Sequence, residues 1–111
     1  MLNGIYHLRF TSSLSNYGEG IAVVSGNSFN GGNGGFIFTG TQAVNGNKFE
    51  CTLSIKQWNE EVVSIFGPIK AFTLILTGAN TPDGGFVAMG HLTGHAESKI
   101  TIEARYLSPI A

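Results

Sequence analysis

The chain contains little of what nucleic-acid-binding and membrane proteins usually need. Only 12% of its 111 residues are charged, and the six Lys and Arg and seven Asp and Glu form no run of more than two like charges. Because no basic stripe is present for phosphate backbones, direct nucleic-acid binding is not expected. No run approaches the roughly 18 apolar residues that span a bilayer, and the first residues do not resemble a signal peptide. We therefore expect a cytoplasmic protein without membrane contact.

Cysteine and aspartate are nearly absent. Cys51 is the single cysteine, which excludes an intrachain disulfide, and its place in an alternating run predicts a buried structural thiol. Asp83 is the single aspartate and lies in a Pro-Asp-Gly turn. No nucleophile, base and orienting group can be combined from such a chain, so neither an enzyme nor a cofactor is expected.

Two histidines, His91 and His95, have the i, i+4 spacing that places two metal ligands on one face of a helix. Gly90 and Gly94 instead indicate a strand and a turn, where that geometry does not follow. No metal site is expected.

Alternating side chains are abundant. Phe49, Cys51, Leu53 and Ile55 are separated by charged or polar residues, which is the period-2 pattern of a half-buried strand. Asn45-Gly46 precedes this run and predicts a type I′ turn, in a hairpin over residues 36–58. Shorter alternating runs predict further strands over residues 4–11, 18–25, 69–77, 85–92 and 98–107.

Two connections have their own composition. Residues 31–35 are glycines around Asn33 and predict a loop or a sharp barrel corner rather than the interior of a strand. Residues 59–66 predict either a short helical turn capped by Asn59 or an irregular connection.

Seven or eight short strands with almost no helix predict an all-β fold. The simplest arrangement is one domain over residues 1–111, a small antiparallel up-and-down β-barrel, because closure removes exposed edges. An eight-stranded barrel is either filled by side chains or holds one small ligand. The inward side chains that would line such a cavity are Phe49, Leu53, Ile55, Leu74, Ile102 and Tyr106.

Glycines and aromatic residues follow one another in a recognisable order: Gly4-x-Tyr6, Gly18-x-Gly20, Gly26, Gly31-Gly32, Phe38-x-Gly40 and Gly46. In this succession the chain resembles the GrlR-like proteins, negative regulators of type III secretion. The resemblance implies a lipocalin-like barrel, a homodimer, and a regulator that binds a transcription activator. It also implies an exposed acidic run on the hairpin, whereas residues 44–48 here contain Lys48 and no acid.

The leading hypothesis is a non-enzymatic regulator that binds and sequesters a partner protein, and the alternative is a barrel that binds a small apolar ligand. A protein partner predicts an exposed apolar patch of several hundred Å². A ligand barrel predicts a cavity of about 300 Å³ or more. Trp58, Phe66 and Phe86 could form a cavity mouth or a partner or dimer surface, or could simply close the barrel. His7 points outward beside Arg9, as a surface residue or as part of the partner surface.

Overall fold

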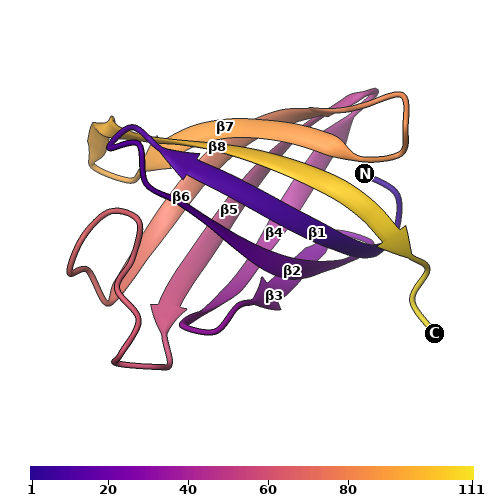
Figure 1. Cartoon of the computed structure of the whole chain (residues 1–111). Coiled ribbons are helices and arrows are strands. Elements are labelled where there is room, and N and C mark those ends of the chain that lie inside the picture. Colours follow the sequence, from indigo (N-terminus) through magenta and orange to yellow (C-terminus); the bar gives the residue numbers. More distant parts are fainter.

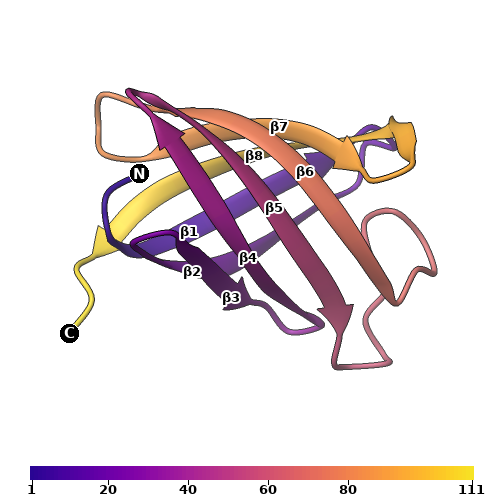
Figure 2. The ribbon, with the colours of Figure 1, turned by 180° about the vertical axis from the view of Figure 1, so that it is seen from behind.

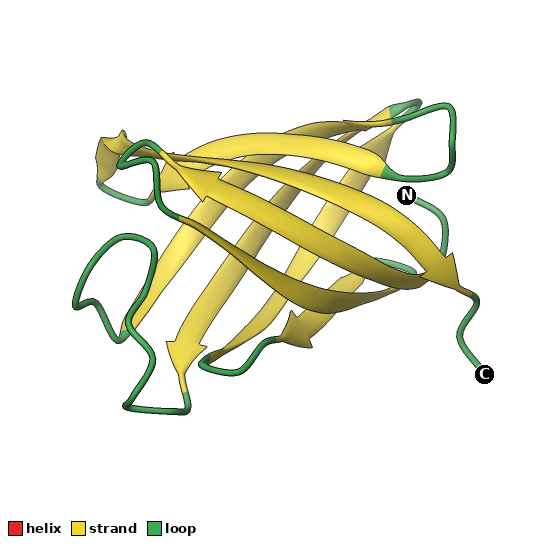
Figure 3. Cartoon of the chain, viewed as in Figure 1, coloured by secondary structure: helices red, strands yellow, loops and turns green.

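The chain forms a closed antiparallel barrel of eight strands in sequence order (Figures 1 and 3). A computed structural model describes residues 1–111. The first strand pairs with both the second and the last, which closes the sheet and confirms the small up-and-down barrel. The strands are β1 (Gly4–Ser12), β2 (Tyr17–Ser25), β3 (Ser28–Gly32), β4 (Phe36–Asn45), β5 (Lys48–Gln57), β6 (Ala71–Asn80), β7 (Phe86–Leu92) and β8 (His95–Ser108).

Inward and outward positions follow the sequence alternation. On β5, Phe49, Cys51, Leu53 and Ile55 are all buried, while Lys48 and the other intervening residues are more exposed. Successive side chains of a strand point to opposite faces, so each strand contributes one row to the core and one row to the outer surface. The core consists of 19 buried apolar residues in a single cluster.

The two ends of the barrel differ in their connections. Both chain termini lie at one end, together with the β2–β3, β4–β5 and β6–β7 turns (Figure 1). The opposite end has the β1–β2, β3–β4, β5–β6 and β7–β8 connections, and the longest of these is residues 58–70 between β5 and β6 (Figures 1 and 2).

Aromatic rings fill the end that holds the termini. Phe86 lies at the centre, with ring centroids 5.2 Å from Tyr6, 5.4 Å from Phe49 and 6.2 Å from Phe29. Tyr106 packs edge-on against Tyr6, with centroids 5.5 Å apart. The tilted and edge-on angles are those that aromatic quadrupoles prefer, so this half of the barrel is densely packed and specific.

The β4–β5 turn differs from the sequence prediction by one residue. Asn45 pairs with Lys48, so the two central residues are Gly46 and Asn47 rather than Asn45 and Gly46. Gly46 has a φ of 64° and Asn47 has no positive φ, whereas a type I′ turn needs positive φ at both central positions. The arrangement with glycine first is that of a type II′ turn.

The structure also differs from one predicted connection and decides between two alternatives for another. Gly31 and Gly32 belong to β3 rather than to a loop, and only residues 33–35 form the β3–β4 connection. A Cβ at Gly31 would lie 2.0 Å from the carbonyl oxygen of Ile21, so close approach of β2 is what requires glycine there. Residues 59–66 form the irregular connection and no helix, with the Asn59 Oδ1 accepting a hydrogen bond from the Glu61 amide at 3.1 Å.

Candidate functional site

An apolar cavity of about 190 Å³ lies in the half of the barrel opposite the aromatic cluster. Its floor consists of inward side chains of the strands, among them Leu8, Leu53 and Ile102. Fifteen of the 18 lining residues are hydrophobic: the full lining is Leu8, Phe10, Tyr17, Gly18, Asn33, Phe36, Phe38, Leu53, Ile55, Val62, Val63, Ser64, Ile65, Phe66, Phe72, Leu74, Ile100 and Ile102.

The roof of the cavity is the β5–β6 connection, residues 58–70, which we call the cap. Val62, Ile65 and Phe66 of the cap line the cavity. The Phe66 ring packs edge-on against Phe72 of β6, with centroids 5.6 Å apart and an interplanar angle of 81°. The cap therefore covers this end of the barrel with the side chains of Val62, Ile65 and Phe66 directed inward.

Hydrogen bonds hold the cap to the β3–β4 connection. The Trp58 indole Nε1 donates to the Asn33 carbonyl oxygen at 3.0 Å, and the Asn59 side-chain amide donates to the Gly34 carbonyl oxygen at 3.1 Å. The Trp58 amide also donates to the carbonyl oxygen of Gly35 at 2.9 Å.

A second set of bonds joins the cap to the β1–β2 region. Ser12 Oγ and the Asn16 side-chain amide both donate to the carbonyl oxygen of Ile65, each at 3.2 Å. The cap is thus held at two sides of the barrel rim by side chains and loop backbone, and its ends meet where the Gln57 amide donates to the Lys70 carbonyl oxygen at 2.8 Å.

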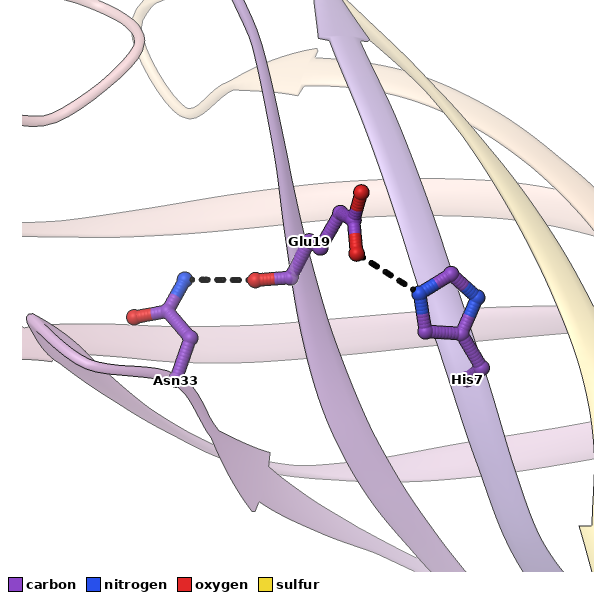
Figure 4. Close-up of polar contacts among 3 residues, drawn as sticks. All are labelled: His7, Glu19 and Asn33. Carbon is purple, nitrogen blue, oxygen red and sulfur yellow. Dashed lines mark hydrogen bonds and ion pairs between the residues drawn. The ribbon is translucent and has the colours of Figure 1, made fainter.

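The lining contains no charged side chain. Asn33 uses its polar atoms within the protein, since Nδ2 donates to the Glu19 carbonyl oxygen at 3.0 Å (Figure 4) and Oδ1 accepts from the Gly35 and Phe36 amides. Ser64 Oγ accepts from the Phe66 amide at 3.0 Å. Tyr17 and Val63 also line the cavity and are 75% and 65% exposed.

The outer surface of β6 and β7 is uncharged. We call this surface the uncharged face: it comprises the outward residues Thr73, Ile75, Thr77, Ala79, Val87, Met89 and His91. Met89 is 60% exposed, and Ile75 and Val87 are also exposed. By contrast, His7, Arg9 and Glu19 lie on the outside of β1 and β2, and Glu103 and Arg105 lie beside them on β8.

The family model described as T3SS negative regulator, GrlR matches residues 1–110. The chain belongs to this GrlR family. No curated protein matches the chain. The family assignment therefore rests on a match that covers almost the whole barrel.

In this GrlR family member several of the glycine landmarks, among them Gly18 and Gly40, occupy inward positions of the barrel, whereas Gly26 and Gly46 lie in turns and have positive φ. A Cβ at Gly40 would lie 2.0 Å from the carbonyl oxygen of Thr52, and one at Gly18 would lie 2.7 Å from the Phe10 ring. The barrel has no space for a side chain at these points, which is a physical reason for the order of glycines that the sequence displays.

The predicted cavity residues divide between the two halves of this barrel. Leu53, Ile55, Leu74 and Ile102 line the cavity. Phe49 and Tyr106 also point inward but pack in the aromatic cluster at the other end. The alternation could also have predicted Leu8, Phe10 and Ile100 as lining residues, but no local signal places Val62, Ile65 or Phe66 of the cap over the barrel.

The four residues predicted at a partner or dimer surface have different positions. Trp58 is 58% exposed at the start of the cap. Phe66 and Phe86 are buried, so neither presents a ring to a partner; Phe66 closes the cavity and Phe86 is the centre of the aromatic cluster. The side chain of His7 points outward, and its Nε2 lies 3.0 Å from Glu19 Oε2 (Figure 4).

The remaining reactive residues in the GrlR-family barrel are dispersed. No group of three or more His, Cys, Asp or Glu side chains is placed to hold a metal ion. His91 lies opposite Lys99 on the outer surface, and His95 Nδ1 lies 3.6 Å from Glu97 Oε1. Burial raises the pKa of the Cys51 thiol to about 12, so the thiol stays protonated and unreactive at neutral pH. No helix is long and apolar enough to cross a membrane.

Proposed function

We propose that this protein is a non-catalytic, cytoplasmic regulator of type III secretion that acts by binding another protein. The observation that supports the proposal is membership of a family of negative regulators of this system, over residues 1–110. A regulator without assembled catalytic groups can act through occupancy, since a bound surface is unavailable to any other molecule. A transcription activator is the partner class that the family resemblance suggests.

We propose further that the protein is a homodimer and that the uncharged face joins the two copies. In a two-fold interface the same surface meets itself, so a charged strip would have to pair each of its charges across the axis or bury some of them unpaired. The surface around His7 and Arg105 would have to remove several charged side chains from water, whereas Ile75, Val87 and Met89 carry no charge. Cores of protein interfaces are depleted in charge and enriched in methionine and aromatic residues, which fits this choice.

Sequestration follows from such an arrangement by mass action. A dimer that covers a surface of the activator removes it from its own target in proportion to the concentration and affinity of the dimer. The exposed Trp58 at the rim is a suitable anchor, because tryptophan is enriched among the residues that dominate binding energies.

A matched pair of variants tests the proposed dimer face. Ile75 on β6 and Ile37 on β4 are each 43% exposed, but only Ile75 belongs to the uncharged face. Sedimentation of Ile75→Asp should show a monomer, because a two-fold interface would bury two carboxylates close together. Ile37→Asp should remain a dimer. A dimer in Ile75→Asp, or a monomer in Ile37→Asp only, would exclude this face.

The regulatory role needs its own assay. In a bacterium that carries a type III system, overproduction of the protein should lower the amount of secreted substrates, and a tagged copy should co-purify with one protein at fixed stoichiometry. Unchanged secretion together with no co-purifying protein would contradict the regulator. Replacement of Trp58 by alanine should weaken the co-purification if the tryptophan is an anchor.

A second candidate function is small-molecule binding, and the cavity is the observation that favours it. At about 190 Å³ the cavity is smaller than the ordinary range for drug-sized ligands, which begins at about 300 Å³. A long acyl chain or a steroid would not fit unless the cap moved away. We therefore restrict this candidate to ligands much smaller than those.

A further inference from the structure

The cap has one side in the cavity and another in solvent. Val62 and Phe66 line the cavity, whereas Trp58, Glu60 and Glu61 on the same segment are exposed. These two glutamates are the only adjacent acidic residues in the chain. A shift of the cap over the cavity would therefore also move Trp58 and the negative charges of Glu60 and Glu61 on the outer surface.

The bonds between the cap and the barrel leave its position dependent on packing. Outside the cap itself, its hydrogen-bond partners are the loop backbone of residues 33–35, the side chains of Ser12 and Asn16, and the backbone amide and side chain of Gln57 at the end of β5. Apart from an isolated bridge between Ser64 and Gly67, the cap has no strand pairing. Atoms that border an empty space lack contact partners on that side, so an occupied cavity would provide contacts that the cap lacks when the cavity is empty.

The lining limits the chemistry of an occupant. No charged group is present, and Asn33 and Ser64 already use polar atoms in hydrogen bonds within the chain. A charged molecule would lose its hydration without compensation, so the ligand must be uncharged. A cavity of about 150 Å³ lined by Leu, Ile and Phe side chains takes up benzene or xenon. The somewhat larger space here suits a single ring with a small substituent.

We propose that the cavity binds a small uncharged molecule with one apolar ring, and that the cap transmits its occupancy to the exposed Trp58 and to the Glu60-Glu61 pair. The proposal rests on the second candidate function and adds the ligand class and the route to the surface. It does not depend on the identity of the protein partner.

Toluene is the probe, and methyl-group NMR of the full chain is the measurement. Toluene should shift the methyl signals of Leu53, Ile55 and Ile102 in a saturable way, because these side chains line the cavity. The methyl signals of Val24 and Leu76 are internal controls, since both residues are buried but do not line it. Benzoate has a similar ring and a carboxylate, and should leave all these signals unchanged.

Trp58 reports on the cap in the same titration. It is the only tryptophan, so its indole N–H gives a single resonance, and this group donates to the Asn33 carbonyl oxygen at 3.0 Å. The resonance should shift with the same toluene dependence as the cavity methyl groups. Such agreement would support a common binding event.

Ile100→Phe should fill the cavity. Ile100 lines it, so the larger ring of phenylalanine would extend into the cavity volume. Unchanged Val24 and Leu76 signals would show that the barrel is intact. The variant should bind toluene at least about tenfold more weakly. Ile75→Phe, on the outer surface, should bind toluene like the wild type.

Two results would overturn the proposal in distinguishable ways. Shifts of the cavity methyl groups without a shift of the Trp58 indole would refute transmission through the cap while leaving ligand binding in place. No saturable shift of the cavity methyl groups, or shifts confined to exposed residues such as Val87 and Met89, would refute both the ligand class and the small-molecule function. Neither result bears on the proposed protein partner.

Discussion

Replacement of Gly40 by alanine should destabilise the barrel strongly. Gly40 lies on β4 opposite Leu53 of β5. A Cβ there would be 2.0 Å from the Thr52 carbonyl oxygen and 2.8 Å from Leu53 Cδ2, although real Cβ atoms essentially never approach a heavy atom within 3.0 Å. Leu53 could change rotamer, but the Thr52 oxygen is part of the backbone. Relief therefore requires the two strands to move apart.

The expected cost follows from the effect of overpacking a close-packed interior. An additional methylene in a packed core costs about 1–3 kcal/mol of unfolding free energy. Because the closest contact of Gly40→Ala is with backbone, we expect about 3 kcal/mol, the upper end of that range. For a domain of about 100 residues, each kcal/mol lowers Tm by at least about 4 °C, so Tm should fall by about 12 °C or more.

Gly34→Ala is the matched control. Gly34 has no positive φ, and a Cβ there meets no heavy atom within 4 Å. The variant should be neutral or gain about 0.4–1 kcal/mol through reduced entropy of the unfolded chain. Urea unfolding followed by circular dichroism measures both free energies. If the free energy of unfolding of Gly40→Ala lies within about 0.5 kcal/mol of the wild-type value, the barrel tolerates separation of the two strands at Gly40 and the argument from close packing fails.

Three further predictions concern individual groups. Cys51 should resist thiol reagents until the protein unfolds. Burial raises its native pKa from 9.0 to about 12, so between these pH values the unfolded chain releases the thiol proton and the native protein does not. The free energy of unfolding, measured relative to Cys51→Ala, should therefore fall as the pH rises from 9.0 to about 12. Tyr6→Phe removes a 2.6 Å hydrogen bond from the Tyr6 hydroxyl to the Leu2 carbonyl oxygen and should cost about 0.5–1.5 kcal/mol in urea unfolding; no change would mean that water replaces the bond fully. Hydrogen bonds, above all one from the Thr81 hydroxyl, lower the pKa of Asp83 in the native protein. The carboxylate therefore stabilises the native protein above the pKa of the unfolded state, and this stabilisation is lost as pH falls through the native pKa. NMR titration of Asp83 should show a low midpoint that rises in Thr81→Val, and equal midpoints would contradict this cause.

Local patterns in the sequence were sufficient for the strands but not for their connections. The run from Phe49 to Ile55 predicts β5 because alternation depends only on neighbouring residues. The Asn45-Gly46 pair predicts the turn one residue too early, since the pairing of Asn45 with Lys48 is a property of both strands together. The glycine-rich composition around Gly31 predicts a loop because glycine usually weakens a strand, and proximity of the Ile21 carbonyl overrides that preference.

The lining of the candidate cavity could likewise be predicted only where it depends on the alternation within a strand. Leu53, Ile55, Leu74 and Ile102 could be predicted as lining residues because each lies on an inward row. That Tyr106 packs in the aromatic cluster instead depends on its position at the other end of the barrel. The part played by the cap could not be predicted, because residues 58–70 have no periodic pattern.

The all-β class, the inward rows of the most regular strands and the family resemblance follow from the order of the residues alone, because they depend on short-range alternation and on glycines in a fixed order. Which half of the barrel is filled and which is hollow is visible only in the folded chain. That outcome depends on contacts between residues far apart in the chain, such as the bond from Ser12 to the Ile65 carbonyl oxygen across 53 residues. Closure of β1 on β8 brings such segments together, and no local pattern specifies how the side chains then share the enclosed volume.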